Sequence, residues 1–339
     1  MKEKFSYEDG LSQPIVLYGS AEIPVASSGA PDNSTLQNPY ETPIEILEVR
    51  FRCYPKYANS EVIAFQIVTG MAVGVKMDLG KAAVIDGFVP VNALSSNRDS
   101  YENMGQLYSV PSAGALSAAY QVMYAWRPRY PIYIPGRATL ACAFQTQGQN
   151  DTPIVCDVVY IGRTWPAMKP KPRTVKIPWV ASFEARPVET SGTTQALSND
   201  VSSSTDVQNP FAANLELDRV FGRMSQLRPL NPTVGSANNR LIEDSVVGRF
   251  VRFALSIRSS RGFDVLRNLT PFGALFTRNW MVWDIPGRWE LVPREFYTFA
   301  FQAAAGTVNV TAAVAQQSQP SVGIVGYRDV AVTDLGGIS

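Results

Sequence analysis

The fold is decided by a stretch that occurs twice: Gln37-Asn38-Pro39-Tyr40 with residues 41–53 (ETPIEILEVRFRC), and Gln208-Asn209-Pro210-Phe211 with residues 212–224 (AANLELDRVFGRM). In both copies a polar loop ends in Gln-Asn-Pro-aromatic, and the chain then alternates apolar and polar residues. This alternation predicts a half-buried strand. Because the first copy lies early in the chain and the second lies past its middle, the sequence predicts two related halves.

The alternation slips by one residue at the same place in both copies. Apolar positions change parity between Ile46 and Val49 in the first copy, and between Leu217 and Val220 in the second. A one-residue slip moves the following side chains to the other face of the sheet, so it marks a β-bulge. A repeated irregularity favours a duplication more strongly than two similar hydrophobic patterns do.

Other signals recur in the same order. Residues 134–145, from Ile-Pro to Phe-Gln, match residues 292–302, from Val-Pro to Phe-Gln. The two copies of this motif are closer together in the chain than the two Gln-Asn-Pro motifs are, which requires insertions. The stretches that match poorly are rich in Ser, Asn and Gly, as expected for surface loops that tolerate changes in length.

Composition, together with the segments of alternating hydrophobicity along the chain, predicts an all-β fold built from two tandem eight-stranded sandwiches. The 339 residues suit two domains of about 150 residues each. The 24 glycines and 24 prolines favour short strands joined by turns. Two or three short helices are expected, with residues 101–108 and 263–269 as candidates. The predicted parts are an N-terminal arm (1–13), a first sandwich (14–167), a Pro-rich linker (168–177), a second sandwich (178–330) and a C-terminal tail (331–339).

Net charge and cysteine content limit the possible location and partners of the protein. The net charge is +1, so the chain has no overall electrostatic attraction to nucleic acid or to an anionic membrane. Residues 1–10 lack the apolar core of a secretory signal. Cys53, Cys142 and Cys156 have no metal-ligand spacing, and we expect buried, reduced thiols.

The sequence contains no histidine, which excludes Ser-His-Asp and Cys-His catalysis and imidazole metal sites. A glycosidase that uses two carboxylates stays open, with Glu45, Glu48, Asp157, Glu184 and Asp264 as candidates. Glu45 and Glu48 alternate with apolar residues, however, so we interpret them as a solvated strand face.

Asp32, Asn33, Asn199 and Asp200 have oxygen ligands for an ion between subunits, although ordinary turn chemistry explains them better. We therefore predict no catalytic, cofactor-binding or metal-binding residues.

Aromatic residues and arginines gather at matching places in the two halves, and they have two interpretations. They are typical of base-stacking and phosphate-binding surfaces, but also of protein interfaces and cores. Because the chain is nearly neutral, we favour a subunit interface or the sandwich core. The residues are Trp126, Arg127, Arg129, Tyr130, Tyr133, Trp280, Trp283, Arg288 and Trp289.

With its tandem organisation over residues 14–330, its paired motifs and its Pro-rich linker, the chain resembles the double jelly-roll major capsid proteins of tailless icosahedral viruses. These are the tectivirus, corticovirus and finnlakevirus type of bacteriophages. The resemblance implies a structural protein, not an enzyme, that forms homotrimers with a pseudo-hexagonal outline. Trimers would then make lateral contacts in a virion shell assembled in the host cytoplasm.

The resemblance also implies contacts with minor capsid or penton proteins and, in many such viruses, with an internal lipid membrane. It implies no cofactor and no sequence-specific binding of nucleic acid. An alternative hypothesis is a carbohydrate-binding or adhesive two-domain protein, such as a phage spike or a surface lectin.

Overall fold

The computed structural model describes most of the β-framework, and within it nearly every element is a strand. The helical segments whose bounds it describes are single turns, α2 (Val91–Leu94) and η2 (Val332–Leu335). The described residues are 12–24, 32–56, 73–94, 123–146, 153–165, 172–184, 188–190, 195–196, 202–227, 241–242, 253–271, 275, 282–303, 307–308 and 316–336.

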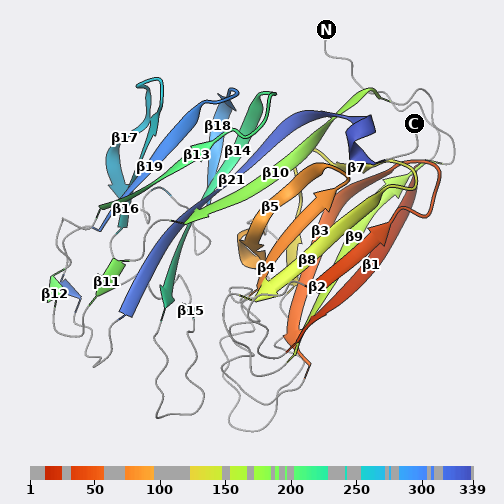
Figure 1. Ribbon diagram of the computed structural model, residues 1–339, viewed down its shortest axis with the longest axis horizontal. Helices are drawn as coiled ribbons and strands as arrows, with labels where there is room; N and C mark the ends of the chain where they lie inside the picture. The colour runs from red at the N-terminus through yellow and green to blue at the C-terminus, as the bar shows by residue number, and fades with distance from the viewer. Residues whose placement is uncertain are drawn as a thin grey trace.

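The first half is a sandwich of two antiparallel layers (Figure 1). One layer has the order β1 (Gln13–Ile23), β9 (Ile154–Thr164), β3 (Ile44–Pro55) and β6 (Met123–Trp126), with β7 (Ile132–Ile134) also on β3. The other has the order β5 (Ala82–Pro90), β4 (Val73–Leu79), β8 (Thr139–Thr146) and β2 (Asp32–Gln37). Phe51 of β3 meets Phe144 of β8 edge to face at 6.3 Å between ring centroids, so the core lies between the layers.

The second half repeats this arrangement. One layer has the order β10 (Thr174–Glu184), β21 (Gln316–Ala331), β14 (Leu215–Leu227) and β18 (Val282–Leu291). The other has the order β13 (Ser202–Gln208), β19 (Phe296–Ala303), β16 (Phe253–Ser259) and β17 (Asp264–Pro271). Short additions are β11 (Val188–Thr190) on β21, β15 (Leu241–Ile242) on β14, and the pair β12 (Gln195–Ala196) with β20 (Thr307–Val308).

Both halves have the strand order of a jelly roll. When the eight main strands of each half are counted along the chain, with β6 and β7 as one strand, both halves give layers 1-8-3-6 and 2-7-4-5. Such an order requires connections that cross from layer to layer, as in a double-sheet jelly roll. The predicted all-β class with two tandem eight-stranded sandwiches is confirmed.

The predicted bulge is present in both halves. The pairing of β3 with β9 shifts between Ile46 and Glu48, and the pairing of β14 with β21 shifts between Leu217 and Arg219. Counted from the asparagine of each Gln-Asn-Pro motif, the two shifts come at the same position. The parity slip in the sequence is therefore the local trace of an inserted residue in the third strand of each jelly roll.

A glycine lies opposite each bulge. Gly162 of β9 pairs with Ile46, and Gly326 of β21 pairs with Leu217. A Cβ atom on Gly162 would collide with the carbonyl oxygen of Glu45, so the two strands approach too closely there for a side chain. A bulge with a glycine opposite it therefore occurs once in each half.

One predicted helix is wrong, because residues 264–271 form strand β17, paired with β16. The segment's short apolar pattern fits either structure, and the partner strand decides between them. The other candidate helix, residues 101–108, lies outside the described residues. The linker was also predicted too long, since its residues 174–177 belong to β10 and pair with β21.

Candidate functional site: two asparagine corners and the junction between the halves

Asn38 ties two connections of the first jelly roll together. Its side chain is only 1% exposed, and its Nδ2 donates to the carbonyl oxygens of Pro135 at 2.9 Å and Thr42 at 3.0 Å. Its Oδ1 accepts from the backbone N–H of Tyr40 at 2.9 Å. The amide thus joins the β2–β3 connection to the β7–β8 turn, and it needs both a donor and an acceptor to do so.

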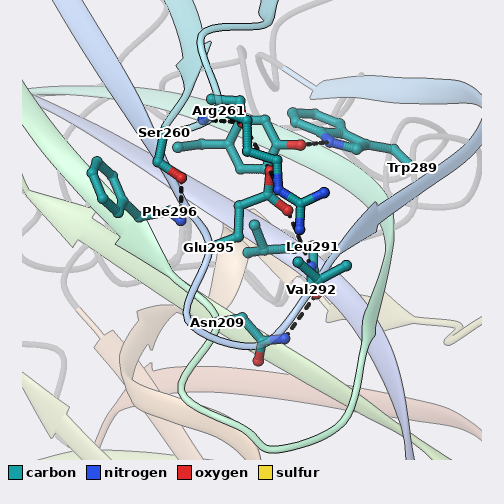
Figure 2. A network of polar contacts seen from close by, with 10 residues as sticks. Asn209, Ser260, Arg261, Trp289, Leu291, Val292, Glu295 and Phe296 are labelled. Carbon is teal, nitrogen blue, oxygen red and sulfur yellow. Dashed lines mark hydrogen bonds and ion pairs between the residues drawn. The ribbon is translucent and has the colours of Figure 1, made fainter.

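Asn209 makes closely similar contacts in the second jelly roll, where Leu291 corresponds to Ile134, whose carbonyl oxygen lies 3.4 Å from Asn38 Nδ2. Its buried Nδ2 donates to the carbonyl oxygens of Leu291 at 2.8 Å, as Figure 2 shows, and of Ala213 at 2.9 Å. Its Oδ1 accepts from the N–H of Phe211 at 2.9 Å. The Gln-Asn-Pro-aromatic motif is therefore a structural corner, repeated once in each half.

The turn that each asparagine contacts is also repeated. It contains the only non-glycine residues with positive φ among those described, Arg137 at 59° and Arg294 at 64°. These two arginines lie as far apart in the chain as Gln145 and Gln302, so they occupy equivalent positions of the repeated motif. The sequence comparison matched Pro135 with Pro293. In the alignment that matches Arg137 with Arg294, Pro135 corresponds to Val292 instead, one residue earlier.

The second corner carries a buried carboxylate. Glu295 accepts from the Ser259 hydroxyl at 2.8 Å and from the Val292 N–H at 3.3 Å (Figure 2). Arg261 lies 3.5 Å from the same carboxylate and balances its charge. This network joins the β16–β17 turn to the β18–β19 turn.

In the first half, the β4–β5 turn is covered by η2. Ala138 stands where the second half has Glu295. The N–H of Lys81 donates to the carbonyl oxygen of Asp334 at 3.0 Å, and Leu335 is fully buried beside Gly80. The two halves therefore share the asparagine corner but seal the turn beside it differently.

The two jelly rolls join edge to edge. β10 of the second half lies parallel to β5 of the first, with Val180 opposite Ile85 and Ala181 opposite Asp86. This pairing makes one sheet that runs from β15 in the second half to β2 in the first. Figure 1 shows β10 and β5 side by side where the halves meet.

Aromatic and charged side chains reinforce the junction. The Tyr327 hydroxyl accepts from the N–H of Arg129 at 2.6 Å, and its ring meets that of Tyr130 edge to face at 4.9 Å. The Lys176 ammonium lies 5.1 Å from the Tyr130 ring centroid and 2.5 Å from a carboxylate oxygen of Glu216. Residues 129 and 130 belong to the first half, and the others belong to the second.

Two more contacts cross the same junction. The indole N–H of Trp179 donates to Asp86 at 3.3 Å, and the Arg328 guanidinium donates to the carbonyl oxygen of Ala83 at 3.3 Å. Arg328 also stacks on Phe211, with 3.7 Å between the guanidinium carbon and the ring centroid. The junction therefore combines backbone pairing, apolar burial and charged contacts, as a protein interface does.

The aromatic residues singled out in the sequence divide between this junction and the cores. Arg129 and Tyr130 lie at the junction, whereas Trp126 and Tyr133 are buried in the first core. Burial raises the pKa of Tyr133 to about 12. Trp283 and Trp289 are partly buried against the second core, where Trp289 donates to the Tyr297 hydroxyl at 2.6 Å. Trp280 and the Arg288 side chain lie outside the described residues.

The expectation that Glu45 and Glu48 form a solvated face is wrong. Both are buried, because arginine side chains cover this face of the sheet. Glu45 binds Arg163 at 2.9 Å, and Glu48 binds Arg127 at 2.7 Å and also Arg50. Alternation in the sequence places these carboxylates on the outer face but does not show which cations lie over them.

These ion pairs decide the protonation of Glu48. Burial alone would raise its pKa, but the hydrogen bonds and positive charges of Arg50 and Arg127 outweigh burial and lower the pKa below its usual value. A glycosidase acid needs a raised pKa so that it carries a proton at working pH. Glu48 is therefore unsuited to that role.

The other candidate carboxylates also have structural partners. Asp157 accepts from the hydroxyls of Tyr18 at 2.7 Å and Ser20 at 3.0 Å, and Asp264 lies 3.6 Å from Arg258. The side chain of Glu184 lies outside the described residues. Glu45, Glu48, Asp157 and Asp264 therefore all have structural partners.

The three cysteines are buried and free, and burial raises the pKa of Cys142 to about 12. Asp32 and Asn33 lie in β2, whereas residues 199 and 200 lie outside the described part. Within that part, no group of three or more His, Cys, Asp or Glu residues could hold a metal ion, and no helix is long and apolar enough to cross a membrane.

The chain is similar in structure to VP54 of PBCV-1, whose crystal structure was fitted into a cryo-EM reconstruction of the virophage Sputnik. The TM-score is 0.50 at 11% identity, and the match covers 94% of both chains. The chain is a double jelly roll. The likeness extends over both sandwiches and is one of fold.

Weaker similarities connect this double jelly roll with two further structures. The major capsid protein P2 of bacteriophage PM2 matches at a TM-score of 0.40 and 7% identity, over 93% of this chain and 98% of P2. The mavirus major capsid protein matches at 0.39 and 8%, over 94% and 90%. No protein-family model matches the sequence, and no curated protein resembles it in sequence.

Replacing Asn38 by Asp tests the corner. The second carboxylate oxygen would face the carbonyl oxygens of Pro135 and Thr42, so we expect the free energy of unfolding to fall by about 3 kcal/mol at pH 7. Gln37→Glu makes the same chemical change at the exposed neighbour and should cost less than about 0.5 kcal/mol. Urea unfolding measures both, and equal losses would contradict the role of Asn38.

Replacing Glu48 by Gln tests the arginine-covered face. Because the folded-state pKa of Glu48 is lowered, its contribution is fully present above the ordinary glutamate pKa and disappears as the pH falls through the folded-state value. We expect Glu48→Gln to cost about 1–3 kcal/mol at pH 7 and progressively less in acid. Glu41→Gln, at an exposed position, is the control, and a cost that does not depend on pH would disprove this account.

Proposed function

We propose that this chain is a viral major capsid protein that assembles as trimers into an icosahedral shell. The observation that carries the proposal is the double jelly roll itself, which matches VP54 over 94% of each chain. VP54 has been fitted into the reconstruction of a virophage particle, and the present chain has the same two-sandwich layout.

The two-sandwich layout suits a subunit that covers the surface of a shell as a repeated unit. Three copies would bring six jelly rolls around one axis and give the pseudo-hexagonal outline that the resemblance implies. The β10–β5 junction supports this arrangement, because it holds two jelly rolls side by side within one chain. Head-to-tail contacts between copies then form a closed ring when the rotation closes.

The two ends of the sandwiches differ in a way that supports two faces of a shell. At the asparagine corners, strands within each half are joined by short connections, such as 80–81 between β4 and β5 and 292–295 between β18 and β19. At the opposite end the connections are longer, and the one from β5 to β6 spans 91–122. We assign the strand ends opposite the asparagine corners to the outside of the shell, and the corners, with the start of β1 and η2 at the same end (Figure 1), to the inside.

The proposed role is structural, without turnover or a cofactor. Lateral contacts between trimers, contacts with minor capsid or penton proteins, and an internal membrane facing the corners belong to the same proposal. Shell assembly needs many modest contacts, because strong ones would trap errors.

The test is the mass and appearance of the purified protein. We expect sedimentation equilibrium at micromolar concentration to give three times the chain mass of 37.1 kDa. Electron microscopy should show capsomers with a hexagonal outline. A stable monomer would contradict the proposal, and glycan-array binding by that monomer would favour the adhesive alternative.

A further inference from the structure

The first strands of the two jelly rolls can be matched residue by residue. Ile15 of β1 pairs with Gly162, the glycine opposite the first bulge, and Trp179 of β10 pairs with Gly326, the glycine opposite the second. Ile15 and Trp179 are therefore equivalent, and this pair aligns the two strands. Matching positions can then be compared for burial.

The outward positions of β1 are exposed where those of β10 are buried. Val16 is 65% exposed, whereas Val180, its counterpart, is completely buried. Pro14 is exposed and its counterpart Pro178 is buried, and Tyr18 is 63% exposed. The difference arises because β10 lies against β5 of the other jelly roll, while β1 pairs with β9 alone among the described strands.

The strand that covers Val180 also has a counterpart. Ile85 of β5 pairs with Met77, and Leu266 of β17 pairs with Ile257, at equivalent points of the fold. On either side of these two pairs, the register shifts by the same number of residues in the β4–β5 pairing as in the β16–β17 pairing. The register irregularity is therefore repeated as well. β17 therefore corresponds to β5, and Leu266 corresponds to Ile85.

β17 is an edge strand with apolar residues at its surface. Within the described residues it pairs with β16 alone. Leu266 is partly exposed, although Ile85 is completely buried, and Phe263, just before the strand, is 62% exposed. Within the chain, the first strand of the second jelly roll (β10) pairs with the fifth strand of the first jelly roll (β5). The first strand of the first jelly roll (β1) and the fifth strand of the second (β17) are left as edges among the described strands.

We propose that β1 of one copy lies parallel to β17 of the next copy, with Val16 opposite Leu266, and so repeats the β10–β5 junction between chains. This inference rests on the proposed function and specifies the surface through which the copies of a trimer meet. The contact is head to tail, because each copy offers β1 to one neighbour and β17 to the other.

The physical reasons are backbone pairing and apolar burial. An open edge strand has unpaired N–H and C=O groups that favour pairing with another chain. β1 is eleven residues long, and the outward side chains in its first half are Pro14, Val16 and Tyr18. A twofold contact between two β1 strands would be antiparallel and would leave β17 open. The internal junction is parallel and joins unlike edges, so it favours the head-to-tail arrangement.

Engineered cysteines test the pairing. Opposed residues in paired strands are close enough for a disulfide, and the three native cysteines are buried. After oxidation, Val16→Cys mixed with Leu266→Cys should give a covalent dimer on a non-reducing gel. A chain with both changes should give a covalent trimer. Leu47→Cys with Leu266→Cys is the control, because Leu47 is exposed on β3, away from the edge, and should not cross-link.

A charge at the edge gives an independent measurement. Val16→Lys should weaken trimer formation at least about tenfold, because the ammonium would be buried against Leu266. The unfolding midpoint of the monomer should not change, since Val16 is exposed within one chain. Leu47→Lys should leave the trimer intact.

The outcomes separate the two proposals. If the unmodified protein is a trimer but Val16→Lys is also a trimer and the mixed cysteines do not cross-link, the surface is wrong and the proposed function stands. If Val16→Cys alone forms dimers, the contact is twofold and the head-to-tail inference is overturned. A monomeric unmodified protein would overturn the proposed function itself.

Discussion

The parallel pairing of β10 with β5 is the contact on which the rest of the structure depends. It turns two separate sandwiches into one sheet-linked body and buries Val180 and Ile85 against each other. Tyr327, Tyr130 and Arg328 then add contacts that neither half could make alone. Because the pairing joins unlike edges, it also determines which edges stay open for another copy.

Duplication explains why the same physical solutions appear twice. Each half places an inserted residue in its third strand and a glycine opposite it, and each uses an asparagine amide to connect a loop to a turn. These are positions where backbone groups would otherwise be buried without partners or too close together. The strand order is the same in both halves, although the numbers of residues between corresponding strands differ.

Buried charged side chains help to hold strands and turns together in this molecule. The carboxylates of Glu45, Glu48 and Glu295 are buried and each is balanced by an arginine. Such pairs specify which strands and turns lie together, and removing one partner leaves a costly buried charge. The chain as a whole carries a net charge of only +1.

The sequence by itself determined the duplication, the strand-rich fold, the repeated bulge and the burial of the cysteines, because these depend on local alternation and on similarity between the halves. The tertiary structure alone decided that residues 264–271 form a strand, that arginines cover Glu45 and Glu48, and that β10 pairs with β5. Each of these depends on a partner far away in the chain. A pattern with a period of two residues shows which face a side chain takes, but not what lies against that face.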